Sequence, residues 1–353
     1  MKLLIYLISL IFVGTSHAHA WEDFYILKPG QLRFERAPSQ KFSHFSQSDC
    51  RSRIQQITCI VNPSQNPQES RQCQADSPAA APTLEKIYDI LPPKLQKVFC
   101  GLDVIYIENE LESLAYAGVI QADAQGNVRG SFMGIRRSLI EQNYDATSVF
   151  GWKEQKAFGI KAPPFVHLPE GPRVDVTLPI SLSALHYIIV HEFAHILDFS
   201  NSANHFICPE GVTCDLSDWN PEEFKKLVPK EGSWGALSWE SPLAPLPEQK
   251  FPLWSKLCFY GCSERLGLED IEAFYHQLHP TNFVSTYAAV SPFEDFAESL
   301  TFAVMAEHSD FQYQIQTPYA SYSLETKWRE IGPKKIWMQD FLNRDLKYPS
   351  PMK

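Results

Sequence analysis

The sequence predicts an α+β domain, and two observations support this fold class. Segments that favour strands come first, over residues 102–109, 118–140 and 173–181, and segments that favour helices dominate the remainder. Residues 185–199, LHYIIVHEFAHILDF, are apolar on almost every side, which is typical of a helix buried inside a protein. Strands followed by helices, without regular alternation between them, indicate an α+β domain.

The first twenty residues have the features of a secretory signal peptide. Lys2 gives a positive start, an apolar run follows, and the ending AHA suits cleavage after Ala20. The alternative is an uncleaved membrane anchor, but the apolar run is short for a bilayer span. We therefore expect a secreted or periplasmic protein with no membrane span after cleavage.

The remaining chain is expected to divide into two parts. Residues 21–82 form a Cys-bearing N-terminal segment that ends in a linker rich in Pro, Gln and Ser. Residues 83–353 form the main domain, which begins with helical character interrupted at Pro92. Within this domain, residues 118–140 predict a hairpin around a Gln-Gly-Asn turn.

The second half of the main domain contains a long insertion and several helices. Residues 200–260 hold many prolines and four tryptophans, and we expect a lid-like subdomain or an irregular surface excursion. Helical periodicity returns afterwards, over residues 268–279, 291–308 and 325–343. The last of these helices is expected to break at Gly332-Pro333.

The eight cysteines favour disulfides in an oxidising compartment, because their number is even and they follow a signal peptide. Close spacing predicts the pairs Cys208–Cys214 and Cys258–Cys262. The four earlier cysteines are expected to pair among themselves. A zinc site built from thiolates is disfavoured, because the chain has no Cys-x-x-Cys pair.

The net charge of −10 argues against nucleic acid as a partner, because phosphate binding needs a basic surface. It excludes little else, since soluble enzymes of many kinds carry a similar charge. The oligomeric state is not specified by the sequence.

The helix 185–199 carries the motif His-Glu-x-x-His. Residues four apart lie on one face of a helix, so His191 and His195 can both reach one zinc ion. Glu192 is offset by one residue, where it can act as a base on a zinc-activated water. The alternative is a structural cluster of histidine and carboxylate, which would also satisfy buried ionisable groups. His186 is expected to be structural, and Asp198 to orient the site or cap the helix.

A catalytic zinc usually has a third protein ligand. A metzincin would need histidine at position 201, which is Asn201, so that class is excluded. Glu294 and Glu298 share a face of the later helix, whereas Asp295 points away. The alternative role for Glu294 is closure of a capping box that begins at Ser291.

Together these residues resemble the gluzincin metallopeptidases, and Tyr287, seven residues before Glu294, is similar to the tyrosine of the anthrax lethal factor type of peptidase domain. The resemblance implies a zincin-like domain with a small sheet and an active-site helix. It implies one Zn²⁺ held by three ligands, an orienting role for Glu298 on a ligating histidine, and an oxyanion contact from Tyr287. The three ligands are His191, His195 and Glu294. By the same analogy, residues 130–140 would be the edge strand that pairs with substrate.

One departure from the family keeps the third ligand open. Position 294 lies 99 residues beyond His195, which is a longer gap than such peptidases usually have. The rival ligands in or near the insertion are Glu210, Glu240, His276 and His279.

These expectations predict a secreted or periplasmic zinc metallopeptidase that acts on peptides or proteins, with Glu192 as general base. The alternative is a non-catalytic zinc-containing binding protein that uses exposed aromatic residues of the insertion. A further possibility left open is that residues 21–82 act as an inhibitory pro-segment.

Overall fold

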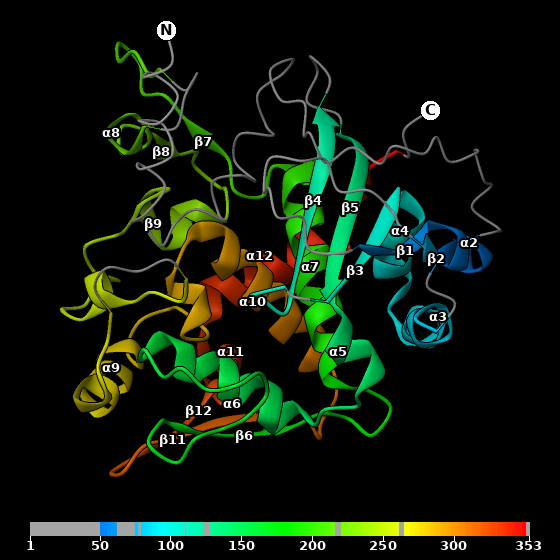
Figure 1. Cartoon of the computed structure of the whole chain (residues 1–353). Helices are drawn as coiled ribbons and strands as arrows, with labels where there is room; N and C mark the ends of the chain where they lie inside the picture. Colours follow the sequence, from blue (N-terminus) through cyan, green and yellow to red (C-terminus); the bar gives the residue numbers. More distant parts are fainter. Residues whose placement is uncertain are drawn as a thin grey trace, which may run out of the picture.

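The computed structural model of the chain describes residues 50–61, 75–76, 79–109, 111–122, 128–215, 220–260 and 265–350. The expected signal peptide and most of the expected linker lie outside these residues. The described part is a mixed α+β structure with small sheets (Figure 1). This confirms the predicted fold class at the level of α+β.

The largest sheet has five strands in the order β2-β1-β3-β5-β4. β1, β3 and β5 are mutually parallel, whereas β2 and β4 pair antiparallel with their neighbours. The predicted hairpin is confirmed as β4 and β5, and its turn lies outside the described residues. The strands are β1 (Thr58–Val61), β2 (Ala75–Asp76), β3 (Val104–Glu108), β4 (Ala115–Ala122) and β5 (Val128–Arg136).

The expectation that residues 130–140 form the edge strand is wrong. β5 lies between β3 and β4, and seven of its nine residues are buried, as a central strand requires. Gly134 in β5 lets the ring of Tyr116 in β4 lie directly over the backbone, because any Cβ there would overlap that ring. β4 is therefore the strand at this edge among the described residues. The chain leaves β5 in a short helix, α5 (Arg137–Glu141), where the sequence had predicted more strand.

Residues of the N-terminal segment join the main sheet through β1 and β2. The helix α2 (Cys50–Ile57) precedes them, and α3 (Ala81–Ile90) and α4 (Pro93–Gly101) follow. The disulfide Cys50–Cys100 connects α2 to α4. The predicted pair Cys208–Cys214 is confirmed. Cys59 and Cys258 are also disulfide-bonded. Cys262, the expected partner of Cys258, and Cys73, the last but one of the four earlier cysteines, lie outside the described residues.

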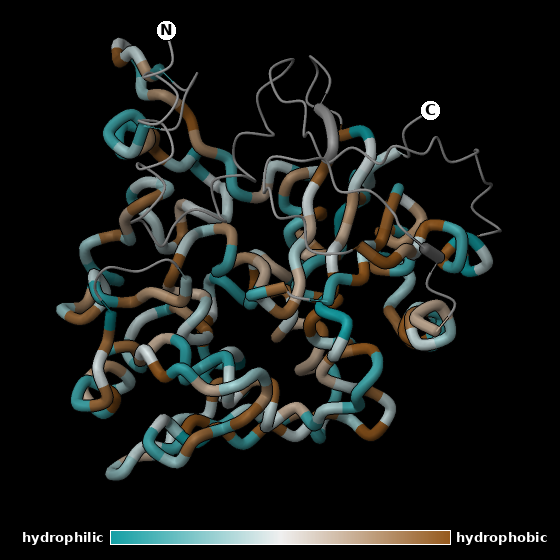
Figure 2. Tube along the Cα trace, viewed as in Figure 1, coloured by the Kyte–Doolittle hydropathy of each residue, from teal (hydrophilic) through white to brown (hydrophobic). Residues whose placement is uncertain are grey.

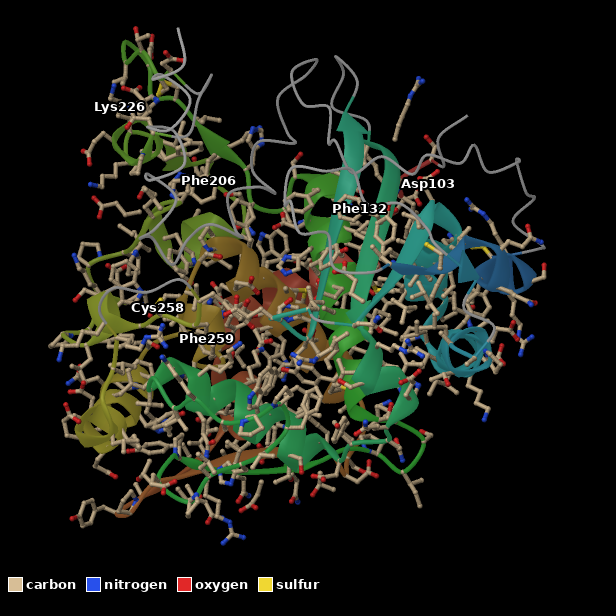
Figure 3. The ribbon with its side chains drawn as sticks, in the orientation of Figure 1. Asp103, Phe132, Phe206, Lys226, Cys258 and Phe259 are labelled. Atoms are coloured by element: carbon tan, nitrogen blue, oxygen red, sulfur yellow. A yellow bond between two sulfur atoms is a disulfide. The ribbon has the colours of Figure 1, made fainter. Side chains whose placement is uncertain are left out.

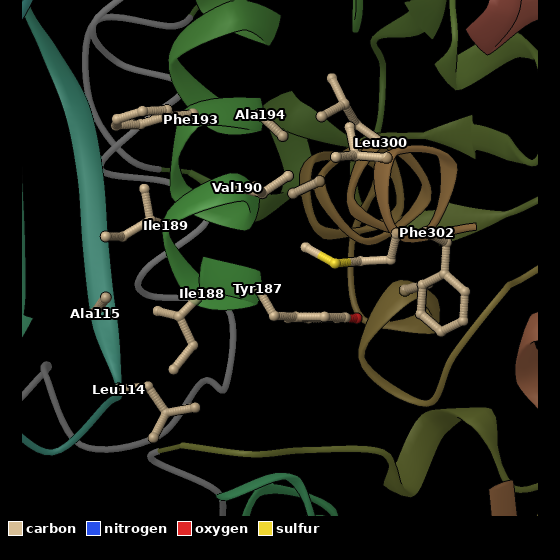
Figure 4. Close-up of a cluster of buried hydrophobic side chains, with 14 of the residues drawn as sticks. Leu114, Ala115, Tyr187, Ile188, Ile189, Val190, Phe193, Ala194, Leu300 and Phe302 are labelled. Carbon is tan, nitrogen blue, oxygen red and sulfur yellow. The ribbon is translucent and has the colours of Figure 1, made fainter. Parts of the chain in front are cut away.

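The centre of the molecule is the pair of helices α7 (Ala184–Asn201) and α10 (Pro292–Met305). α7 lies between β4 and α10, so it is covered on two opposite sides (Figure 4). Ile188, Ile189 and Phe193 face the strand, whereas Tyr187 and Val190 face α10 (Figure 4). Figure 2 shows hydrophobic residues along these central segments and hydrophilic residues on outer helices such as α8. This double burial explains why the sequence of α7 is apolar nearly all round.

A second, three-stranded sheet lies beneath the helix α6 (Ala146–Ala157). Its order is β12-β11-β6, with both pairings antiparallel. The sequence predicted β6 (Arg173–Thr177), which comes first along the chain. It did not predict α6, β11 (Gln312–Gln316) or β12 (Ser321–Ser323).

Residues 200–260 form short elements joined by turns, as the sequence predicted. However, Trp234 and Trp239 are fully buried, and the indole N–H of Trp239 donates to Asp295 on α10 at 3.1 Å. These two tryptophans therefore belong to the core and are not part of an exposed aromatic surface. The elements are β7 (Phe206–Ile207), α8 (Pro221–Phe224), β8 (Val228–Pro229), η2 (Gly235–Leu237), β9 (Trp239–Ser241), β10 (Ala244–Pro245) and η3 (Trp254–Lys256).

The remaining elements are mostly helical and cover α10. The predicted break at Gly332-Pro333 is confirmed between α11 and α12. Among the described residues, no helix is both long and apolar enough to cross a membrane. The elements are η4 (Leu268–Asp270), α9 (Ile271–Leu278), η5 (Tyr287–Ala289), α11 (Leu324–Glu330) and α12 (Gly332–Asn343).

Candidate metal centre

α7 is fixed at both ends, which sets the orientation of its motif. At the start, Ser183 and His186 form a reciprocal capping box, and burial lowers the pKa of His186 to about 4. At the end, Asp198 accepts hydrogen bonds from the backbone and side chain of Asn204, at 2.7 and 2.6 Å. Both residues are therefore structural: His186 as expected, and Asp198 in the helix-end role that was one of its two predicted alternatives.

α10 supplies the carboxylate that faces the two histidines. Ser291 caps this helix by accepting from the backbone N–H of Glu294 at 3.2 Å, so the Glu294 side chain points inward. Its Oε2 lies 3.1 Å from Nε2 of His191 and 3.5 Å from Nε2 of His195. The predicted capping role of this side chain is therefore replaced by a contact with both imidazoles.

His191, His195 and Glu294 form a group that is able to hold a metal ion. One ligand atom from each residue lies within 4.8 Å of the others. The three side chains are buried, with exposed fractions of 5 to 8%, so solvent competes little with a bound ion. The rival ligands lie exposed and outside this group, at Glu210, Glu240, His276 and His279.

Glu298 contacts His191 on the side of the ring opposite to Glu294. Its Oε1 lies 2.9 Å from Nδ1 of His191, while Nε2 of the same ring faces Glu294. A carboxylate on the second ring nitrogen of a metal-ligating histidine fixes the ring and its tautomer. Three further groups bind Glu298: Ser285 Oγ at 2.7 Å, Lys153 Nζ at 3.2 Å and Tyr187 Oη at 3.3 Å.

The electrostatics of the cluster favour a cation. Burial alone would lower the pKa of His191, but hydrogen bonds to Glu294 and Glu298 raise it to about 9. Burial would raise the pKa of Glu294, but His195 and His191 hold it well below its usual range. Burial likewise opposes ionisation of Glu298, but Lys153 and His191 lower its pKa to about 2. Two ionised carboxylates thus surround the imidazoles, and this donor set suits a divalent metal.

Glu192 and Tyr287 border the same group. Glu192 is buried, and its pKa is raised by burial and lowered in part by His191 and His195. The hydroxyl of Tyr287 is hydrogen-bonded to Glu294, and its ring centroid lies 5.8 Å from that of His191. The structure therefore brings all six sequence-predicted site residues together.

The sequence missed the residues that support this group from other elements. Lys153 on α6 reaches Glu298 and also lies over the Tyr287 ring, with Nζ 4.0 Å from the centroid. Ser285 reaches Glu298 from the loop before η5. No local signal marks either residue, because each acts on a partner more than ten positions away in the sequence.

Comparison with protein-family models, curated proteins and solved structures found no match to this chain. The interpretation of the centre therefore rests on the motif and on the geometry described above.

Proposed function

We propose that the protein is a zinc metallopeptidase of the gluzincin type that hydrolyses peptide bonds outside the cytoplasm. One observation carries most of the argument: Glu294 contacts both histidines of the His-Glu-x-x-His motif although it lies 99 residues beyond the second. The two carboxylates on opposite sides of His191 support this reading, because a ligating histidine commonly has a carboxylate on its second ring nitrogen. The disulfides support a location in an oxidising compartment.

The donor set supports zinc as the metal. Two imidazoles and one carboxylate are the ligands of several catalytic zinc sites, which leave a further position open. Zinc held by these residues would act as a Lewis acid and would activate water near neutral pH.

The remaining roles belong to side chains of this chain. Glu192 would accept the proton of the attacking water and return it to the leaving amine. Its burial supports this role, because a raised pKa brings a carboxylate closer to the working pH of a general base. Tyr287 would donate a hydrogen bond to the oxyanion that forms from the substrate carbonyl. Lys153 would keep both Tyr287 and Glu298 in place.

The test separates metal binding from catalysis. We expect one zinc per purified chain by elemental analysis, a large loss of zinc in Glu294→Ala, and no loss in Glu240→Gln, the matched variant of an exposed rival ligand. We expect Glu192→Gln to keep its zinc and to lose about 10²- to 10⁴-fold in the rate of cleavage of casein or a peptide library.

Two outcomes would contradict the proposal. A folded parent that takes up no zinc would mean that the buried histidines are structural. A zinc-loaded parent that cleaves nothing, with the same behaviour in Glu192→Gln, would support the non-catalytic zinc-binding protein instead.

A further inference from the structure

A basic pocket lies beside the metal centre. It has a volume of about 490 Å³ and is lined by the cationic side chains Arg136, Lys156, Lys161 and Arg265. Glu112 is the one carboxylate among the lining residues that the structure describes. The described lining is therefore basic, although the whole chain has a net charge of −10.

These cations form no salt bridge with a described carboxylate, although the charge of Glu112 acts on Lys156. Arg136 donates to the backbone oxygen of Leu111 at 2.7 Å, and Lys156 donates to that of Glu112 at 3.2 Å. Both also lie over aromatic rings: Arg136 is 5.8 Å from the Trp152 centroid, and Lys156 is 4.6 Å from it. Carbonyl groups and rings therefore hold the two cations in position without neutralising their charge.

The charges of the pocket act on one another. Burial lowers the pKa of Lys156, Glu112 raises it, and Arg136 and Arg265 lower it further, to a value of about 8. Burial is the main cause of this low pKa, and the positive charges of Arg136 and Arg265 add to it. A bound anion would relieve this repulsion.

The pocket shares a wall with the metal centre. Phe259 lines the pocket, and its ring centroid lies 4.8 Å from that of Tyr287 (Phe259 is labelled in Figure 3). The Tyr287 ring is in turn 5.8 Å from that of His191. Together, these two separations limit the distance between the Phe259 and His191 rings to at most the span of about three residues of an extended peptide. The next residue, Tyr260, contacts the pocket residue Lys156, whose Nζ lies 4.2 Å from its ring centroid.

We propose that this pocket binds a carboxylate of the peptide substrate, so that the enzyme selects peptides with an acidic group a few residues from the bond that is cut. This inference rests on the proposed function, which makes the ligand a peptide. The carboxylate can come from an Asp or Glu side chain or from the C-terminus of the substrate. Arginine suits such a group, because its guanidinium can donate two parallel hydrogen bonds to a carboxylate.

Binding to the Glu192→Gln variant tests the pocket without requiring cleavage. Three sets of acetylated, otherwise uncharged peptides are titrated calorimetrically, with and without zinc. The first set has an amidated C-terminus and a single Glu moved along the chain, the second has Gln in its place, and the third has Gln with a free C-terminal carboxylate. We expect at least a tenfold preference for a Glu peptide over its Gln counterpart at one position. A preference for the third set instead would assign the pocket to the C-terminal carboxylate.

Matched charge variants assign the preference to the pocket. The double substitution Lys156→Gln and Lys161→Gln should abolish it and leave binding of the Gln peptides unchanged. The control substitutes Lys86 and Lys347, two exposed lysines outside the pocket, by Gln and should keep the preference at the same net charge.

Failure of this inference can be told apart from failure of the proposed function. Equal affinities for all three sets, or no binding at millimolar peptide, would overturn the inference even if the parent cleaves peptides. The parent could also cleave nothing and still show a carboxylate preference that depends on Lys156 and Lys161. That result would support the binding role of the pocket and contradict the peptidase proposal.

Discussion

At the scale of single residues, Glu298 has the largest number of partners around the candidate metal centre. Its two oxygens contact His191, Ser285, Tyr187 and Lys153, so the carboxylate is held in one place. Glu298 in turn fixes the His191 ring, which lies between the carboxylates of Glu294 and Glu298. Glu298 should therefore affect metal affinity although it is not itself a ligand.

We expect Glu298→Gln to weaken zinc binding by about 10- to 100-fold, because loss of the carboxylate behind a ligating histidine lowers the basicity and order of the ring. The measurement is competition for zinc with a chelator of known affinity. Glu325→Gln is a suitable control, because this buried carboxylate binds the backbone of Tyr313 and is remote from the ligands. Equal affinities in the parent and in Glu298→Gln would remove the orienting role.

Site residues that lie close together in the sequence could be predicted, whereas those that lie far apart could not. His191, Glu192 and His195 could be predicted because one helical turn fixes their relation. Glu294 could be proposed from the face that it shares with Glu298 and from the resemblance, but rival ligands stayed open because its contact with the histidines depends on how α10 packs against α7. Lys153 could not be predicted, since its two partners lie on elements that meet α6 only in the folded structure.

At the scale of elements, one face of α10 contributes to the candidate metal centre and another face forms a buried ion pair. Glu294 and Glu298 face α7, whereas Asp295 faces α12 and forms a fully buried ion pair with Lys334, at 2.6 Å from both carboxylate oxygens. Trp239 donates to the same carboxylate. Asp295 thus joins the insertion, through Trp239, and the C-terminal helix, through Lys334, to the helix that carries the candidate ligand Glu294.

We expect Lys334→Met to destabilise the protein by about 3–5 kcal/mol, because it leaves Asp295 as an uncompensated buried charge. Denaturant unfolding measures the loss. Lys335→Met, at a half-exposed neighbour without a described ion pair, should change stability by less than about 0.5 kcal/mol. Adding Asp295→Asn to Lys334→Met should recover part of the loss, since Asn removes the charge and can still accept from Trp239. A loss of similar size in both single variants would contradict this account.

Elements with a strong local signal could be predicted, and those defined by pairing could not. α7 and α10 have long apolar patterns, and Pro292 and the Gly332-Pro333 pair mark helix boundaries through the fixed φ and missing N–H of proline. The position of β5 inside the sheet depends on β1 and β3, which precede it by many residues. Its sequence alternates too little to distinguish an edge strand from a central strand.

At the scale of the whole molecule, the metal centre is assembled from three distant parts of the chain. α6, α7 and α10 contribute Lys153, the histidines and the glutamates, and one large hydrophobic core packs all three helices together. The disulfide Cys50–Cys100 adds a covalent link between the N-terminal segment and α4, which contacts α7. The core and the disulfide thus supply contacts between these elements that do not involve the candidate ligands.

We therefore expect the protein to remain folded when zinc is removed, but with a lower thermal stability. A ligand at about a hundred times its dissociation constant stabilises the folded state by about 2.7 kcal/mol. For a protein of about 300 folded residues, this corresponds to a Tm lower by about 4–5 °C after treatment with chelator. Circular dichroism should report unchanged secondary structure below the transition, and added zinc should restore the Tm.

The Glu294→Ala variant provides the comparison for this experiment. Its Tm should respond weakly to chelator and to zinc, because it lacks the ligand that joins α10 to the two histidines. Loss of secondary structure in the metal-free parent would show that the ion is needed for folding, against the argument from the core. A Tm shift of equal size in Glu294→Ala and in the parent would place the bound zinc elsewhere in the molecule.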